Sequence, residues 1–188
     1  MLKPKNNKKG FTIIEVVLVL AIAGLIFMAV FIALPALQRS QRDTRRKQDV
    51  SRVVAQLQSY QSNNRSRLPG EAADSNGSPK TGNVTRDMIK DNVATNTWEY
   101  FYKNYLISED SDDFADPNGD SYSLKVVDTD AALPASFKEQ ASADPKYAIM
   151  IHLGFQCDGE DIKAATGGKR KVAVRYRGES GNVICQNN

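Results

Sequence analysis

Residues 8–34, KKGFTIIEVVLVLAIAGLIFMAVFIAL, decide how the rest of this chain must be organised. Residues 16–34 form an unbroken apolar run. As an α-helix, about 19 residues rise roughly 28 Å, which is close to the ~30 Å thickness of a bilayer's hydrocarbon core. The apolar region of a cleaved secretory signal is shorter, typically ~7–15 residues. The run therefore predicts a membrane-spanning helix.

Composition limits what the remaining residues can be. The chain has 188 residues, 41% of them hydrophobic and 25% charged, so one globular domain can follow the apolar run, and several further membrane spans cannot. One His and two Cys do not favour a zinc site or a His-based catalytic centre. The first ten residues carry four lysines and no acid, so the rest of the chain has a formal charge near −1 against +3 for the whole. That balance does not favour nucleic acid as a partner.

Glu15 is an ionisable side chain at the start of the apolar run, where an unpaired carboxylate costs a few kcal/mol. In one interpretation it reaches the membrane interface. In the other, cleavage between Gly10 and Phe11 creates an amine at Phe11, which pairs with Glu15 of a neighbouring copy. Charge counting does not settle the orientation of the helix, because five cations at residues 39–47 balance the four N-terminal lysines.

The junction closely resembles the class III signal of type IV prepilins and their relatives, including pseudopilins. Four residues and a glycine in the apolar helix carry the resemblance: Gly10, Phe11, Thr12, Glu15 and Gly24. The resemblance implies that a membrane-embedded prepilin peptidase cuts after Gly10 and N-methylates Phe11. It also implies that Glu15 is the assembly glutamate and that the leader faces the cytoplasm.

The helix is predicted to continue beyond Pro35 to Asn64, with a kink between Gly24 and Pro35. Pro35 lies slightly further from Phe11 than the helix-breaking proline of the pilins it resembles. In the second half of this helix, five apolar residues recur at helical spacing: Val50, Val53, Val54, Leu57 and Tyr60. Arg39–Asp43 and Arg45–Asp49 lie at i,i+4 spacing on the opposite face. This half must pack on a globular domain.

An α+β, pilin-like fold follows, with the long helix on an antiparallel β-sheet of about four strands. An aromatic stripe predicts a short core helix over residues 96–107, and period-two alternation predicts strands over residues 121–127, 147–155, 171–177 and 182–186. The expected segments are a leader (1–10), a membrane or filament-core helix (11–37), its amphipathic continuation (38–64), an αβ-loop region (65–120) and the sheet (121–188).

Cys157 and Cys185 are an even pair in a protein delivered outside the cytoplasm, which predicts a disulfide. The loop it would close resembles the C-terminal disulfide loop of many pilins. The bond would fix the last strand to the sheet.

Residues 109–120 contain six acids and no base, a pattern typical of a solvated loop. The pattern of Asp116, Pro117, Gly119 and Tyr122 also resembles the motif near the calcium loop of major pseudopilins. By that resemblance calcium would be held by acidic residues of the loop: Asp112, Asp116 and Asp120. A further hypothesis pairs the loop with the basic residues 39–52 of a neighbouring subunit.

The basic segment 169–177 has two interpretations. Its charges protect a sheet edge from strand-to-strand aggregation, or they bind DNA as in competence pilins.

The resemblance implies a structural subunit, not an enzyme, that needs no cofactor other than the calcium considered above. Its location would be the cytoplasmic membrane as a single-pass prepilin, then an extracellular filament. Its partners would be copies of itself, a prepilin peptidase, an inner-membrane platform protein, an assembly ATPase and minor pilins. A pilus serving motility, adhesion or surface contact is the first expectation. The alternatives are a pseudopilin of a type II secretion system, a minor or competence pilin involved in DNA uptake, and a membrane-anchored extracellular enzyme or binding domain.

Overall fold

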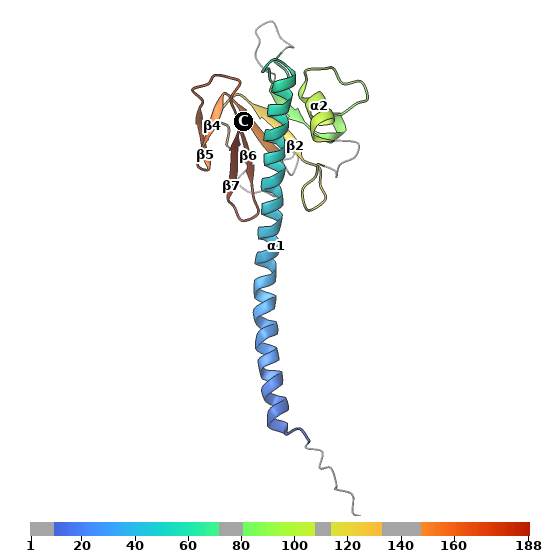
Figure 1. Ribbon diagram of the computed structural model, residues 1–188, viewed down its shortest axis with the longest axis vertical. Coiled ribbons are helices and arrows are strands. Elements are labelled where there is room, and N and C mark those ends of the chain that lie inside the picture. The colour runs from blue at the N-terminus through green and yellow to red at the C-terminus, as the bar shows by residue number, and fades with distance from the viewer. Residues whose placement is uncertain (1–9, 72–80, 108–113, 133–147) are drawn as a thin grey trace, which may run out of the picture. The chain divides into compact units, whose positions relative to one another are not determined.

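The computed structural model describes residues 10–71, 81–107, 114–132 and 148–188. The chain divides into two compact units, residues 1–40 and 41–188, and each is described by itself. Helix α1 (Ile13–Asn63) contributes residues to both (Figure 1). It begins two residues after Phe11 and ends one residue before the predicted end at Asn64, which confirms the long N-terminal helix.

The second unit contains a mixed sheet of five strands in the order β1-β2-β3-β6-β7. The strands are β1 (Gly82–Val84), β2 (Ser123–Val127), β3 (Ala148–Leu153), β6 (Val172–Arg177) and β7 (Val183–Asn187). The expectation of an antiparallel sheet is wrong for one pair, because β2 and β3 run parallel with Leu124 opposite Ile149. Residues 128–147 between them are enough for the crossover that parallel strands require. The α+β class is confirmed, and in the described part of the chain this sheet has one strand, β1, beyond the four expected.

The predicted strand over residues 147–155 is divided at Gly154, and Tyr147 lies outside the described residues. Gly154 has a φ of +79°, a backbone conformation that glycine adopts without strain. After this turn, β4 (Phe155–Asp158) pairs with β5 (Asp161–Ala164) in a separate two-stranded sheet. The hairpin was not predicted, since its short strands lack clear alternation.

The predicted helix over residues 96–107 is confirmed in its place, although it has two parts. Helix α2 (Trp98–Phe101) continues into a π-helical turn, η2 (Tyr102–Leu106). The side chain of Thr97 caps α2 by accepting a hydrogen bond from the Tyr100 amide. A short 3₁₀ turn, η1 (Arg86–Met88), precedes it in the chain.

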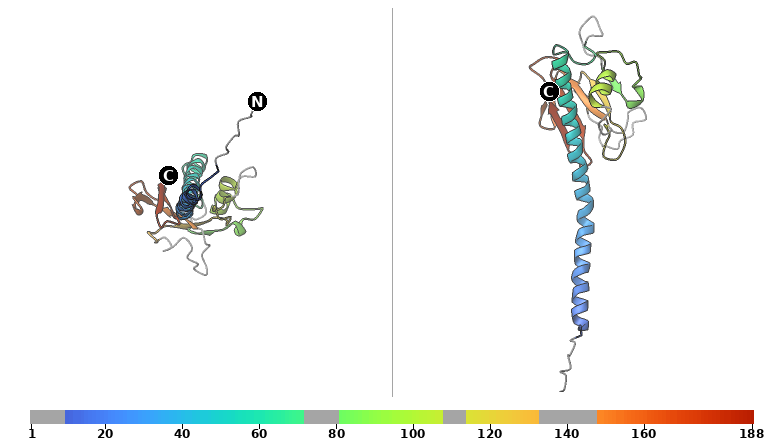
Figure 2. Two further views of the ribbon diagram at one scale, coloured as in Figure 1. Left: turned by 90° about the horizontal axis from the view of Figure 1, so that it is seen from below. Right: turned by 45° about the vertical axis from the view of Figure 1, so that its right-hand side comes forward.

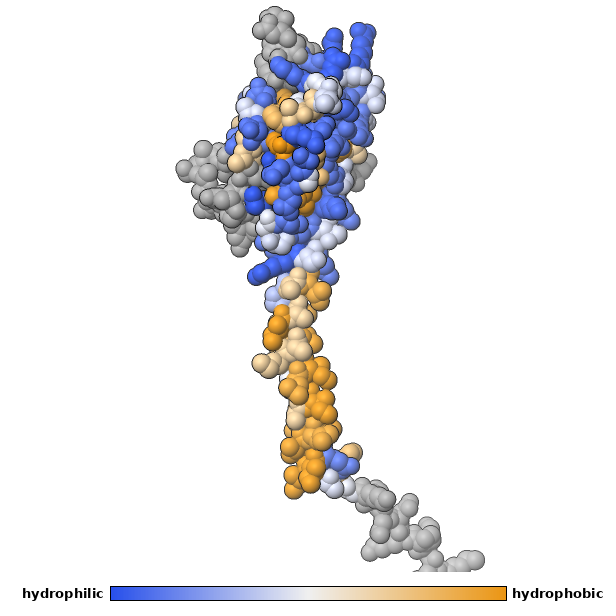
Figure 3. Space-filling view, turned by 90° about the vertical axis from the view of Figure 1, so that its left-hand side faces the viewer, coloured by the Kyte–Doolittle hydropathy of each residue, from blue (hydrophilic) through white to orange (hydrophobic). Residues whose placement is uncertain are grey.

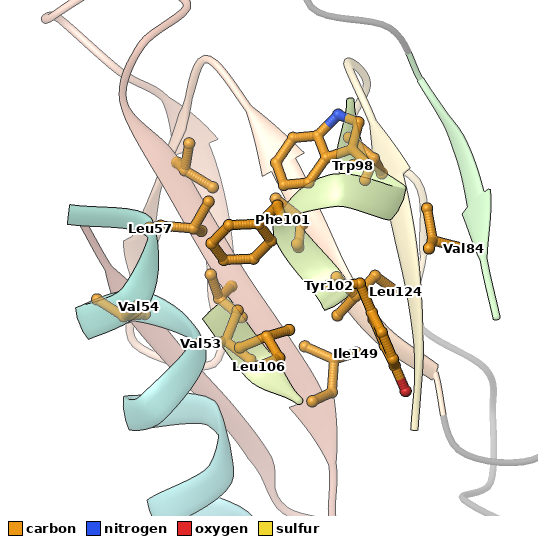
Figure 4. Close-up of a cluster of buried hydrophobic side chains, with 14 of the residues drawn as sticks. Val53, Val54, Leu57, Val84, Trp98, Phe101, Tyr102, Leu106, Leu124 and Ile149 are labelled. Atoms are coloured by element: carbon orange, nitrogen blue, oxygen red, sulfur yellow. The ribbon is translucent and has the colours of Figure 1, made fainter. Parts of the chain in front are cut away.

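The core lies between the second half of α1, α2 and one face of the five-stranded sheet. The two helices cover the same face (Figure 2). In Figure 4, Val53 and Leu57 of α1 point toward Phe101 and Ile149. The Tyr60 and Phe101 rings meet edge to face with centroids 5.9 Å apart. The aromatic stripe is therefore a packing surface, as predicted.

The other face of the sheet is also covered along β3 and β6. Met150, His152, Ala173 and Arg175 are all buried there. Arg175 Nη2 donates to the carbonyl of Glu160, in the turn between β4 and β5, so the hairpin contributes to this cover. Burial on both faces explains why β6 contains buried residues at consecutive positions.

Candidate functional site

The expected cleavage bond lies in accessible chain. Gly10 and Phe11 precede α1, outside regular secondary structure, and both are exposed. No described atom lies within 4 Å of a Cβ built on Gly10. A protease must bind its substrate in an extended form, so this geometry leaves the Gly10–Phe11 bond available. Residues 1–9 of the leader lie outside the described residues.

Thr12 and Glu15 form a reciprocal cap at the start of α1. The Glu15 carboxylate accepts hydrogen bonds from the Thr12 amide and hydroxyl, both at 3.0 Å. The Thr12 hydroxyl accepts one from the Glu15 amide at 3.3 Å. Such a capping box satisfies donors that an isolated helix end leaves without partners. Glu15 is therefore partnered within its own chain before any second copy is present.

The family resemblance includes Thr12 but does not predict its capping role. A detectable signal was present, because Thr-x-x-Glu directly before an apolar run is the sequence pattern of a capping box.

The first half of α1 exposes apolar side chains around its whole circumference. The large hydrophobic residues from Ile13 to Leu37 are between 46% and 84% exposed. Figure 3 shows them as a continuous apolar surface on the side that faces the viewer. α1 is long and apolar enough to cross a membrane, and none of its most apolar window is buried within the described chain. This surface requires lipid or other protein to cover it.

Gly24 and Pro35 both lie inside α1, which is described as one helix through both positions. Pro35 has no amide hydrogen, so the helix lacks one backbone hydrogen bond there. The kink between these residues stays a prediction.

A buried group of charges lies in the second unit, around Arg46 of α1. The Arg46 side chain is fully buried, and so is that of Asp116. Arg46 Nε and Nη2 donate to the two carboxylate oxygens of Asp116 at 2.6 and 3.0 Å. Arg46 Nη1 donates to Asp43 at 2.9 Å, and Nη2 also donates to Glu179 at 3.1 Å. One guanidinium thus holds three carboxylates from three parts of the chain.

Asp43 also binds the turn between β6 and β7. Its carboxylate accepts hydrogen bonds from the Glu179 and Ser180 amides at 2.9 and 3.2 Å, and from the Ser180 hydroxyl at 2.7 Å. Gly178 permits this approach, since a Cβ there would lie 2.9 Å from the Asp43 carboxylate carbon. Arg42 completes the contact by donating to both Glu179 oxygens at 2.9 and 2.6 Å. α1 is therefore joined to this turn by contacts in both directions.

The electrostatics favour the charged form of the main partners. Burial alone would lower the pKa of Arg46, but hydrogen bonds and charge from Asp116 outweigh it and raise that pKa. Burial would raise the pKa of Asp43, yet hydrogen bonds from Ser180 and the Glu179 amide hold it below its usual range. Hydrogen bonds from Arg42, the largest influence, lower the pKa of Glu179. The group is thus an ionic network at neutral pH.

Sequence spacing gave a different expectation for these charges. Asp43 and Asp49 were placed on the exposed face of α1 with Arg39 and Arg45, whereas Asp43 is buried with Arg46. Asp49 instead accepts a hydrogen bond from the Tyr122 hydroxyl at 2.8 Å. The Asp43–Arg46 pair is local, but Arg46 also binds Asp116 and Asp49 binds Tyr122, partners that lie 70 or more residues away. Helical spacing shows only local pairs.

The acidic loop has one of its predicted calcium ligands inside this network. Asp116 is bound to Arg46, Asp120 is exposed, and Asp112 lies outside the described residues. The residues described contain no group of three or more His, Cys, Asp or Glu side chains placed to hold a metal. The hypothesis above pairs this loop with basic residues of a neighbouring subunit. Within one molecule, Asp116 of the loop is already bound to Arg46, one of those basic residues.

The predicted disulfide is confirmed. Cys157 in β4 and Cys185 in β7 are bonded, with their Cα atoms 5.8 Å apart. The bond therefore joins the two-stranded sheet to the last strand of the five-stranded sheet.

The basic segment 169–177 does not protect a sheet edge. Its strand, β6, lies between β3 and β7, so this explanation is wrong. Arg175 is buried, and burial lowers its pKa, whereas Lys169, Arg170 and Lys171 are exposed in the preceding turn. DNA binding by this segment stays a prediction.

His152 belongs to the fold. It is fully buried, with Nδ1 2.9 Å from the Thr129 carbonyl oxygen, and burial lowers its pKa.

The prokaryotic N-terminal methylation motif matches residues 5–31, which contain Gly10, Phe11 and Glu15. No curated protein and no solved structure matches the chain. The motif is a class III signal, which in general implies membrane anchoring, processing by a prepilin peptidase and self-assembly, and it points to a structural subunit and not to an enzyme. The motif stands at the head of a long apolar N-terminal helix, and together these two features support a type IV pilin-like precursor.

Proposed function

We propose that this protein is a prepilin that polymerises, after cleavage between Gly10 and Phe11 and N-methylation of Phe11, into a type IV pilus or related filament. The observation that carries the proposal is the first half of α1, whose large side chains are apolar and exposed on all sides. A helix of this kind is stable within a bilayer or within a bundle of similar helices. Packing against copies of itself covers the same surface after it leaves the membrane.

Glu15 supports assembly through its position as well as its charge. In the isolated chain its carboxylate is held by Thr12. Cleavage after Gly10 would add an amine at Phe11, four residues away in sequence. In a helix bundle, the Phe11 amine of one copy can pair with Glu15 of the next. Loss of one partner from a buried ion pair typically costs ~3–5 kcal/mol, so the pair would fix the axial register of neighbouring helices.

The remaining partners follow from the proposed assembly. Removal of the helix from the bilayer needs energy, and the sequence contains no P-loop with which this chain could hydrolyse ATP itself. A membrane platform protein and an assembly ATPase would supply that step, and minor pilins would join the filament. The domain of residues 41–188 would be outside the cytoplasm, where its disulfide is stable.

A pseudopilin of a type II secretion system is the second candidate, together with a minor or competence pilin. The methylation motif favours all of them equally. Isolation of the protein from long surface filaments would favour a pilus, whereas a secretion defect without such filaments would favour a pseudopilus.

The decisive variant is Glu15→Ala. We expect leader removal to continue, because the cleavage bond is unchanged, and filament formation to be lost. The control is Asp87→Asn, which also removes a carboxylate, but at an exposed residue of η1. This variant should assemble normally. Leader removal is measured by the mass of the membrane-bound protein, and assembly by the protein recovered in sheared surface filaments. Normal function of Glu15→Ala in the absence of any filament would instead indicate a membrane-anchored extracellular enzyme or binding domain.

A further inference from the structure

The loop Phe114–Tyr122 is the part of the chain that resembles a calcium-binding region of pseudopilins, and its Asp116 does not fit that role. Asp116 Oδ2 accepts from Arg46 Nε at 2.6 Å and from the Tyr176 hydroxyl at 3.3 Å. Asp116 Oδ1 accepts from Arg46 Nη2 and from the Asn118 amide, both at 3.0 Å. A carboxylate offers about four acceptor positions, and all of them are used.

Access to Asp116 is closed as well. Its side chain has no exposed surface, and neither has that of Arg46. Calcium requires six to eight oxygen ligands at ~2.3–2.6 Å, usually including water. Asp116 could join such a set only if Arg46 moved away and left its own charge buried without this partner, which is strongly unfavourable.

We propose that the guanidinium of Arg46 takes the place of a metal ion in this loop, so that the loop is organised without calcium. Arg46 meets the electrostatic requirement that calcium would meet, because it brings positive charge to a buried carboxylate. It also gives directional contacts, since a planar guanidinium can donate two parallel hydrogen bonds to one carboxylate.

The position of Arg46 on α1 adds a function that a bound ion would not have. The same guanidinium also contacts Asp43 and Glu179. It therefore joins the loop Phe114–Tyr122 to α1 and to the turn between β6 and β7. The loop itself turns back through a bridge between Ala115 and Ser121 and a hydrogen bond from the Asp116 amide to the Asp120 carbonyl. The order of this loop is therefore coupled to the packing of α1 and does not depend on calcium in the medium. This role of Arg46 in folding is independent of filament assembly.

The test is the thermal unfolding of the full-length chain in detergent, in millimolar calcium and in a calcium chelator. Millimolar calcium fills even weak extracellular sites. We expect the same Tm in both conditions for the wild type. Arg46→Met, which retains much of the side-chain volume, should lower the Tm by about 10 °C. Adding Asp116→Asn to Arg46→Met should recover part of the loss, because it removes the unpaired buried carboxylate.

The matched control is Asp120→Asn, at an exposed carboxylate of the same loop, which should leave the Tm unchanged in both conditions. A calcium-dependent rise in the wild-type Tm that either Asp116→Asn or Asp120→Asn abolishes would overturn the proposal. An Arg46→Met protein with the wild-type Tm would overturn it too. If Arg46→Met does not fold, Arg46→Lys gives the same test: it retains the charge without the two parallel hydrogen bonds and should have a Tm below that of the wild type. The calcium comparison on the wild type requires no variant.

Discussion

The two halves of α1 differ in where their partners lie. The first half, within residues 1–40, exposes its large apolar side chains, whereas the second half buries Val50, Val53, Leu57 and Tyr60 against α2 and the sheet. Burial of the second half thus stabilises the fold of one chain. Cover for the first half must come from outside the described chain. A single helix therefore joins a segment adapted to lipid or other subunits to a segment that folds its own domain.

The largest expected difference between the halves is for a leucine truncated to alanine in each. Leu57→Ala should reduce the free energy of unfolding of the domain by about 3–5 kcal/mol, because Leu57 is fully buried. Leu18→Ala should change it by less than about 0.5 kcal/mol, since Leu18 is 57% exposed. Unfolding in detergent can be followed by the fluorescence of Trp98, which is buried. Equal losses in the two variants would contradict the division of roles.

The second prediction concerns the disulfide, whose partners both lie in the second unit. Replacement of Cys157 and Cys185 by Ser should cost about 3–4 kcal/mol of domain stability, because the bond closes a loop with a sequence separation of 28. Denaturant unfolding of the variant and of the chemically reduced wild type should give similar midpoints. A variant as stable as the oxidised protein would show that the bond contributes little to the fold.

The third prediction uses pH to test the ionic network. Glu179→Gln should cost about 1.5–3 kcal/mol at neutral pH, since it weakens charged hydrogen bonds to Arg42 and Arg46. The pKa of Glu179 is lower in the folded state than its ordinary value, so its contribution is present above that ordinary pKa and is lost as the pH falls through the folded pKa. The difference between wild type and variant should therefore disappear in acid.

Asp128→Asn, at an exposed carboxylate after β2, is the control for this pH series. It should have the wild-type stability at every pH. A Glu179→Gln difference that persists at low pH would show that the contribution is not ionic.

The fourth and smallest prediction concerns the start of α1. Thr12→Ala removes the capping box and should destabilise the first helical turn by about 1 kcal/mol, with no change in unfolding of the domain. Hydrogen exchange of the first-turn amides should be about fivefold faster. Ser59→Ala, at an exposed position in the second half of α1, should leave that exchange unchanged. Unchanged exchange in Thr12→Ala would mean that the cap does not hold the helix start.

Local patterns in the sequence predicted the elements whose signal is repeated over many residues. The limits of α1 and the apolar face at Val50, Val53 and Leu57 follow from helical spacing, and the aromatic helix follows in the same way. The short strands β1 and β5 have too few residues to show a period. The parallel pairing of β2 with β3 depends on the path of the chain between them, which no local pattern shows.

The candidate site shows the same contrast between residues that are close in sequence and residues that only the fold brings together. Gly10, Phe11 and Glu15 are close in sequence, so their resemblance to a class III signal is visible within one short stretch, and the methylation motif supports it. Arg46 and Asp116 are 70 residues apart in the sequence. Within its own segment, each looks like an ordinary surface charge. Only the fold shows that they meet in a buried position.

The most direct test of the central claim is the N-terminal residue of the protein recovered from the cell surface. Sheared surface material can be purified and its N-terminal peptide identified by mass spectrometry. The account predicts filaments whose subunits begin with N-methylated Phe11. Recovery of the protein only as a monomer that retains residues 1–10 would contradict it.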